Sequence, residues 1–214
     1  MQMSYGFPER ELPEGLFASS DKTRASSRRG TQVFYHVGPE GHRVENAAYA
    51  FTEVPEGRPD TGGYVFLDFH SMQAWYEEDE ELIGHPRDPF TRIDVRRGSA
   101  HIRVTAGGVT VADSPRPKLL LETGLPTRYY IPYEDVAWEH LVRSETTTVC
   151  PYKGRSKYWS VHAGDAVYPD VVWAYPFPLQ DAEAVQGHLC FYQEKLELHL
   201  NGEKQFEPPR FFTK

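Results

Sequence analysis

The chain of 214 residues has only two cysteines, Cys150 and Cys190. It also lacks any run of about 18 apolar residues of the kind that crosses a membrane. Two thiols are too few for a disulfide scaffold, and residues 1–29 have no apolar core of the signal-peptide type. We therefore expect a protein of the reducing cytoplasm that has no membrane partner.

Basic residues and metal-ligand motifs are scarce as well. Lysine and arginine number 23 against 31 acidic residues, which gives a formal net charge of −8. A general nucleic-acid binder needs a basic footprint, so we expect no nucleic-acid partner. The sequence has no Cys-x-x-Cys pair, whereas a structural zinc needs four cysteine or histidine ligands in close pairs. The residues imply no metal and no organic cofactor.

Short segments rich in β-branched and aromatic residues are what the sequence does contain, separated by 17 glycines and 17 prolines. Such runs are typical of strands, and the pairs Gly107-Gly108 and Asn201-Gly202 suit hairpin turns. The expected strands cover residues 31–37, 48–54, 64–69, 101–106, 109–113, 118–122, 128–131, 156–162, 170–175, 189–192 and 196–200. Many short strands at close spacing predict a mostly β fold, an antiparallel β-tent or sandwich with a few short helices.

The helices that we expect are few, and they help to divide the chain. Ser71 is placed to cap a helix that runs through Glu80, and Asp181 to cap another over residues 182–186. We expect an irregular N-terminal arm over residues 1–30 and a tail over 208–214. Between them we expect a β part with one helix and a linker over 31–92, and the main β domain over 93–207.

Several motifs in the second half carry a family resemblance. They are Glu122-Thr123-Gly124-Leu125-Pro126, Cys150-Pro151-Tyr152-Lys153-Gly154 and Val171-Val172-Trp173-Ala174-Tyr175-Pro176. In this order they resemble the domain-of-unknown-function family 427. The resemblance implies a β-tent, two antiparallel sheets pinned at one end, similar to methionine sulfoxide reductase B and to the ligand-binding domain of cereblon.

The N-terminal half departs from this pattern. The segment His85-Pro86-Arg87-Asp88-Pro89 resembles the linker of tandem members of the family. Residues 31–69 would then correspond to a first repeat, yet they contain neither the Cys-Pro-Tyr-Lys-Gly element nor the Glu-Thr-Gly-Leu-Pro element. We interpret this half as a degenerate or truncated copy.

Three residues of these motifs are candidates for catalysis: Cys150, Lys153 and Glu122. Cys150 is either a nucleophile activated by the nearby ammonium of Lys153 or a buried small hydrophobe. Lys153 either orients an anionic or carbonyl group or lies exposed at a loop tip. Glu122 either pairs with Lys153 or Arg128, or serves as an acid or base with a raised pKa.

Aromatic residues on neighbouring strands supply the candidate binding wall. With Arg128, the substrate-binding candidates are Tyr130, Tyr152, Tyr158, Trp159, Trp173 and Tyr175. Alternate side chains of a strand share a face, so Trp173 and Tyr175 should point together, while Tyr158 and Trp159 should point oppositely. The wall either lines a cleft for a planar or cationic ligand or forms an ordinary sandwich core.

The function that we prefer from these residues is binding, and as an extension conversion, of a small organic molecule by metal-free acid–base chemistry. A non-catalytic module that recognises a small molecule or a peptide is one alternative. Another is a covalent hydrolase that uses Cys150, Lys153 and Glu122, the residue types of the nitrilase triad. A Cys–His pairing with His140 or His162 is also open, and so is the oligomeric state, including a homodimer.

Overall fold

The computed structural model describes residues 4–206, which divide into two compact units, one ending at Pro86 and the other beginning at Arg87. Strands hold 52% of the chain and helical turns 9%, so the prediction of a mostly antiparallel β protein with a few short helices is confirmed. The predicted tail over 208–214 lies outside the described residues. Within residues 4–206, no helix combines the length and the apolar character that a membrane crossing requires.

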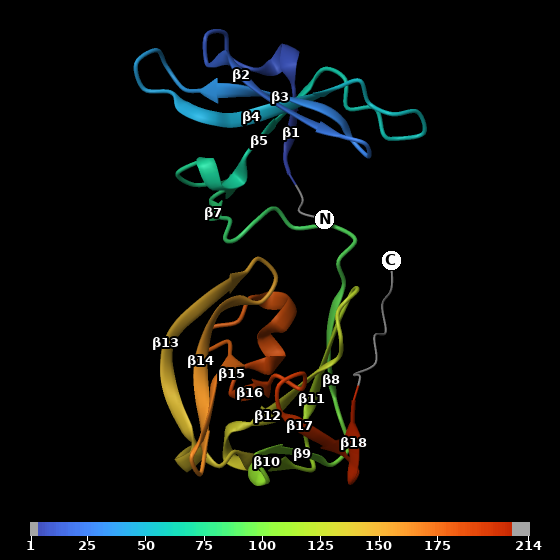
Figure 1. Cartoon of the computed structure of the whole chain (residues 1–214), viewed down its shortest axis with the longest axis vertical. Coiled ribbons are helices and arrows are strands. Elements are labelled where there is room, and N and C mark those ends of the chain that lie inside the picture. The colour runs from blue at the N-terminus through green and yellow to red at the C-terminus, as the bar shows by residue number, and fades with distance from the viewer. Residues whose placement is uncertain (1–3, 207–214) are drawn as a thin grey trace. The chain divides into compact units, whose positions relative to one another are not determined.

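The first unit is built on a five-stranded sheet in the order β1-β5-β4-β3-β2 (Figure 1). Its strands are β1 Gly6–Pro8, β2 Phe17–Ser26, β3 Gly30–Val37, β4 Val44–Thr52 and β5 Tyr64–Leu67. The short 3-10 helices η1 Glu9–Glu11 and η2 Phe69–Ser71 and the small hairpin of β6 Tyr76–Glu77 and β7 Glu80–Glu81 complete it. One face of the sheet forms a small core around Val37, Ala48 and Val65.

The opposite face of this sheet carries half-exposed aromatic rings. Tyr49 stacks on Phe66 with ring centroids 5.5 Å apart, and Phe51 meets both rings edge-on. Phe34 lies opposite Tyr49 on the neighbouring strand and extends the row. The rings therefore pack mainly against one another.

The prediction of an irregular arm is wrong for residues 6–26, which contain β1, η1 and β2. β2 pairs with β3 over most of its length, from Phe17 opposite Val37 to Ser26 opposite Gly30. Beyond its first residues, β2 carries few apolar side chains and is largely exposed, so no hydrophobic alternation marks it. β2 is a strand because its backbone pairs with β3, and the sequence pattern does not predict this pairing.

The helix predicted from Ser71 to Glu80 is also wrong. Residues 76–81 form the β6–β7 hairpin instead, and Glu78 takes a positive φ of 53° in its turn. The Trp75 ring stacks on Phe69 at 5.4 Å and its Nε1 donates a hydrogen bond to the Phe69 carbonyl. A helix would also have ended in the acidic run 77–81, where carboxylates oppose the helix dipole.

The second unit contains a seven-stranded sheet in the order β13-β14-β15-β16-β12-β11-β8 and a four-stranded sheet in the order β10-β9-β17-β18. The larger sheet consists of β8 Ile93–Arg97, β11 Lys118–Glu122, β12 Arg128–Pro132, β13 Leu141–Cys150, β14 Gly154–Ala163, β15 Ala166–Ala174 and β16 His188–Phe191. The smaller consists of β9 Ile102–Ala106, β10 Val109–Ser114, β17 Glu197–Leu200 and β18 Glu203–Gln205. The 3-10 helices are η3 Tyr133–Asp135, η4 Trp138–His140 and η5 Gln180–Val185.

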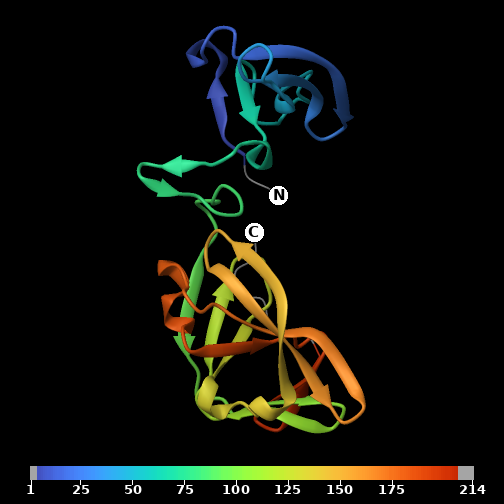
Figure 2. The same cartoon turned by 90° about the vertical axis from the view of Figure 1, so that its left-hand side faces the viewer.

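The seven-stranded sheet curves around η5, as Figures 1 and 2 show from two directions. Alternate residues of β15 and β16 divide between two apolar clusters. Val172 and Phe191 join the cluster that includes Ile102 and Leu198 of the smaller sheet. Their neighbours join a second cluster, which consists of Leu120, Tyr130, Tyr158, Trp173, Tyr175, Ala182, Val185 and Cys190. We call the side of the large sheet that carries this second cluster the η5 face.

The predicted helix over residues 182–186 corresponds to η5, but its start and its cap are different. η5 is a 3-10 helix that begins at Gln180 after Leu179, with no side-chain cap. Asp181 lies inside it and forms an ion pair with Arg87 instead of capping. The Asp181 carboxylate therefore binds Arg87, the first residue of this unit.

Candidate functional site

The Cys-Pro-Tyr-Lys-Gly element is the turn between β13 and β14, with Cys150 paired to Gly154 across its base. Gly154 has a φ of 102°, and a Cβ atom there would stand 3.0 Å from the Phe177 carbonyl oxygen. The N–H of Leu179 donates to the Lys153 carbonyl at 3.1 Å. Glycine is required at this position because the turn lies directly against residues 177–179.

Lys153 and Glu122 form a salt bridge on the η5 face, with 2.5 Å between Nζ and Oε2. Both side chains are nearly buried, exposing 11% and 10% of their surface. A charge that is buried without a partner costs several kcal/mol, so each of these groups stabilises the other. Glu122 was expected to pair with Lys153 or Arg128 or to act as an acid or base, and in the structure it pairs with Lys153.

A row of side chains crosses the η5 face beside this pair. Tyr158 lies opposite Trp173, Trp173 opposite Cys190, and Cys190 opposite Tyr130 on successive strands. Burial raises the pKa of the Tyr130 phenol well above 10, with a smaller contribution from the nearby thiol of Cys190. Tyr130 is therefore neutral, and the Glu122 carboxylate lies near it.

Tyr175 connects this row to the candidate catalytic residues. Burial raises the pKa of its phenol, and Cys150, Tyr158 and Glu122 lie close enough to add to the shift. Trp173 and Tyr175 both belong to the second cluster, against which Cys150 packs. The structure thus gathers Glu122, Lys153 and Cys150 around one neutral, aromatic neighbourhood.

Arg128 lies at another edge of the same face. Its Nη1 donates to Glu194 Oε2 at 2.8 Å. Its guanidinium lies 5.6 Å from the Trp173 ring and 5.7 Å from the Tyr192 ring. Arg128 was among the predicted binding residues, whereas Glu194 and Tyr192, which follow β16 and carry no motif, were not.

Tyr152 has a different environment from the other aromatic candidates. Its hydroxyl oxygen accepts a hydrogen bond from the Asp88 backbone N–H at 2.5 Å. Arg87 lies over its ring at 5.2 Å and also pairs with Asp181 of η5. Tyr152 therefore anchors the first residues of this unit beside the turn, and we call residues 87–90 the entry segment.

Trp159 does not join the other candidates, which corrects its place in the predicted wall. It packs against the first cluster, and its ring meets that of Trp138 at 6.1 Å. The reason is the strand alternation, which sends Trp159 to the side opposite Tyr158. The predicted alternation is confirmed, because Tyr158 belongs to the second cluster and Trp159 packs against the first. Trp159 therefore does not lie on the η5 face.

The two cysteines are free thiols in different surroundings. Cys190 is fully buried, and that burial raises the pKa of its thiol, although Arg128 and Lys153 act in the opposite direction. Cys150 is half-buried at the turn. Neither candidate histidine lies beside Cys150: Leu141 and Val161, next to His140 and His162, pair at the far end of the β13–β14 hairpin. Within residues 4–206, no cluster of three or more His, Cys, Asp or Glu side chains is arranged to hold a metal ion.

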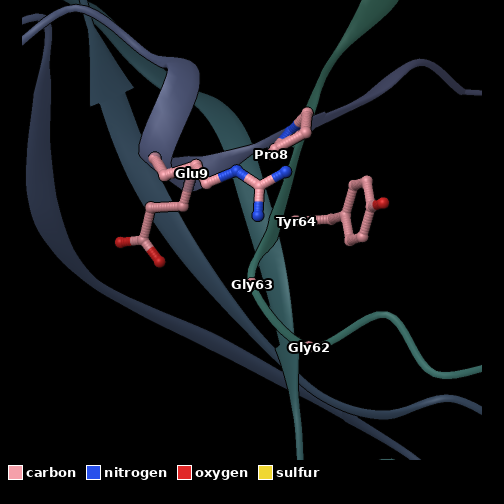
Figure 3. Close-up of a pocket in the computed structure, with 6 residues that line it drawn as sticks. Pro8, Glu9, Gly62, Gly63 and Tyr64 are labelled. Carbon is pink, nitrogen blue, oxygen red and sulfur yellow. The ribbon is translucent and has the colours of Figure 1, made fainter.

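The first unit contains an open pocket of about 460 Å³. It is lined by Pro8, Glu9, Arg10, Gly62, Gly63 and Tyr64. Figure 3 shows the Glu9 carboxylate and the Tyr64 ring pointing away from each other across the Gly62-Gly63 backbone. Polar groups that diverge in this way do not define a binding site.

The second unit is thus an antiparallel β domain of two sheets whose larger sheet carries a charged and aromatic face. The family model described as Domain of unknown function (DUF427) matches residues 94–202, which is just over half of the chain. The chain belongs to this family, and the match includes Glu122, Arg128 and Lys153. No curated protein matches the sequence. Residues 31–69 lie outside the match, so their interpretation as a degenerate copy stays a prediction.

Proposed function

We propose that the second unit binds a small organic molecule at the η5 face, next to the Lys153–Glu122 pair. The observation that carries the proposal is a nearly buried ion pair placed beside aromatic side chains. A lysine ammonium can donate three hydrogen bonds, and Glu122 accepts one of them. The remaining donors suit a carbonyl or carboxylate group of a ligand, while the aromatic rings suit its planar part.

Entry to the site involves the segments that border the turn. Lys153, Trp173 and Tyr175 are all buried. A ligand therefore reaches them only if a neighbouring segment moves. The entry segment, which contacts Tyr152, and residues 177–179, which contact Lys153 and Gly154, border the turn. Phe177 is 86% exposed, so its side chain can cover a bound molecule without first leaving a core.

Conversion of the ligand is the second candidate, and the location of Cys150 and Glu122 around Tyr175 favours it. In this scheme the Cys150 sulfur attacks the carbonyl carbon of an amide or ester, the thiol proton passes to Glu122, and Lys153 stabilises the oxyanion. When the carbonyl re-forms, the bond to the amine or alcohol breaks, the leaving group takes the proton from Glu122, and water then hydrolyses the thioester. A scheme without the thiol leaves acid–base work to Glu122. Both schemes are free of metal and cofactor, and two free thiols suit the reducing cytoplasm.

Saturation-transfer NMR with benzoate, benzamide and benzamidine tests the binding proposal. These three probes share a planar ring and differ in charge, so they separate recognition by Lys153 from recognition by the rings alone. We expect benzoate and benzamide to bind, and K153M to lose both. Lys204, whose exposed ion pair with Glu197 measures 2.6 Å, provides the matched control, and K204M should keep both signals.

Removal of one partner from a buried ion pair can unfold a protein. A second variant therefore separates loss of binding from loss of folding. In the double variant K153M/E122L both charges are replaced by apolar side chains of similar size, which preserves packing. We expect it to fold, as judged by its amide NMR spectrum, and not to bind benzoate. Equal benzoate signals from the wild type and from this folded double variant would overturn the proposal.

A further inference from the structure

A second cation borders the η5 face in addition to Lys153. Arg128 and Tyr130 are two residues apart on β12 and share this face. Arg128 lies opposite Leu120 on β11, and Glu122 is two residues beyond Leu120 on that strand. Side chains in such a diagonal relation on neighbouring strands are within reach of each other. The Arg128–Glu194 and Lys153–Glu122 pairs therefore border one continuous surface.

The Arg128–Glu194 pair presents its cation to this surface and its carboxylate to solvent. The Arg128 side chain is 20% exposed and lies against Trp173 and Tyr192, whereas Glu194 is 45% exposed. A guanidinium has five N–H donors in a planar fork, and the bond to Glu194 uses one of them. Its remaining donors suit a second planar anion.

Neutral groups lie near the two cations on this face. Arg128 and Lys153 each act to lower the pKa of the Cys190 thiol, so this thiol lies near both cations. Burial nevertheless keeps that thiol neutral, and it keeps the phenols of Tyr130 and Tyr175 neutral too. Each cation thus has one carboxylate partner and donors left over, with aromatic surface between the two.

We propose that the ligand of this face is a small planar dicarboxylate, one carboxylate bound by Lys153, the other by Arg128, with its planar part against Trp173. This inference rests on the proposed function and names its substrate class. Each anchor already has one carboxylate partner, so a singly charged carboxylate suits it better than a phosphate of higher charge. The net charge of −8 disfavours polyanions as well.

The test compares terephthalate and isophthalate with benzoate by NMR titration of the whole chain, with R128M as the variant. Arg116, which forms an ion pair with Asp135 at 3.0 Å, supplies the control R116M in the same unit. We expect at least one dicarboxylate to bind the wild type roughly tenfold or more tightly than benzoate, because a charge-assisted contact is added. R128M should remove this advantage, K153M should weaken all three ligands, and R116M should change nothing.

The outcomes distinguish this inference from the proposed function. If benzoate binds in a Lys153-dependent way but neither dicarboxylate gains from Arg128, the dicarboxylate inference is overturned and the binding proposal stands. If none of the three ligands binds the wild type at millimolar concentration, both are overturned. R128K keeps the charge without the planar fork, and a partial return of the dicarboxylate advantage in this variant supports the role of Arg128 if R128M is poorly folded.

Discussion

The hydroxyl oxygen of Tyr152 accepts a hydrogen bond from the backbone N–H of Asp88, 2.5 Å away. The contact joins the turn that carries Lys153 to the entry segment, and Arg87 strengthens it by lying over the same ring. The Cys-Pro-Tyr-Lys-Gly element is therefore also the place where the first residues of the second unit are anchored. Tyr152 acts in this structure as an anchor more than as a wall of the site.

Removal of this acceptor tests the anchoring role. The substitution Y152F leaves the buried ring in place but takes away the oxygen that the Asp88 N–H uses. We expect the free energy of unfolding to fall by about 1 kcal/mol, since a hydrogen bond contributes about that much to stability. Urea unfolding measures it, with Y133F as a control at a half-buried tyrosine of the same unit. Equal losses in the two variants would refute the anchoring role.

The turn itself provides the second prediction. In G154A the new Cβ would stand 3.0 Å from the Phe177 carbonyl, at a φ of 102° that side chains rarely adopt. We expect a loss of about 1–3 kcal/mol in stability. The control is G164A, where φ is also positive but nothing lies within 4 Å of the new Cβ. If thermal unfolding shows G164A to be the more damaging change, residues 177–179 do not constrain the turn as described.

The Lys153–Glu122 pair is suited to a double-mutant cycle. Because both groups are nearly buried, K153M and E122L should each leave an uncompensated charge and cost about 3–5 kcal/mol. The double variant should recover most of this loss, because its site is apolar and similar in volume. Chemical denaturation of all four proteins gives the coupling energy. Additive losses would show that the two charges do not depend on each other.

The two thiols should differ in their reaction with iodoacetamide at pH 7. Cys190 should stay unmodified until the protein unfolds, because it is fully buried and its pKa is raised. Cys150 is half-buried and should react more slowly than glutathione. Mass spectrometry of the alkylated peptides reports both rates. A Cys150 rate above that of glutathione would favour the covalent hydrolase alternative over simple binding.

Strand positions in the second unit were largely predictable, because they follow local patterns. The range 118–122 coincides with β11, and alternation correctly puts Trp173 and Tyr175 on one face. β13 was missed because its residues are mostly polar and exposed, so only pairing with β14 makes it a strand. Local pattern is also what misled the helix prediction after Ser71.

The composition of the site was predictable in part. The motifs marked Glu122 and Lys153, and their pairing was one of the alternatives because a buried charge needs a partner. The Arg128–Glu194 contact joins residues 66 positions apart and carries no motif, so only the fold reveals it. The same holds for Asp88 and Tyr152, whose contact depends on how the chain enters the unit.

Direct observation of the Lys153 ammonium tests the central claim, that this group receives a ligand. Lysine labelled with ¹⁵N at Nζ gives separate signals for buried, hydrogen-bonded ammonium groups, and K153M assigns the one that belongs to Lys153. We expect benzoate to shift this signal in a saturable way. A Lys153 signal that does not move at saturating benzoate would contradict the claim.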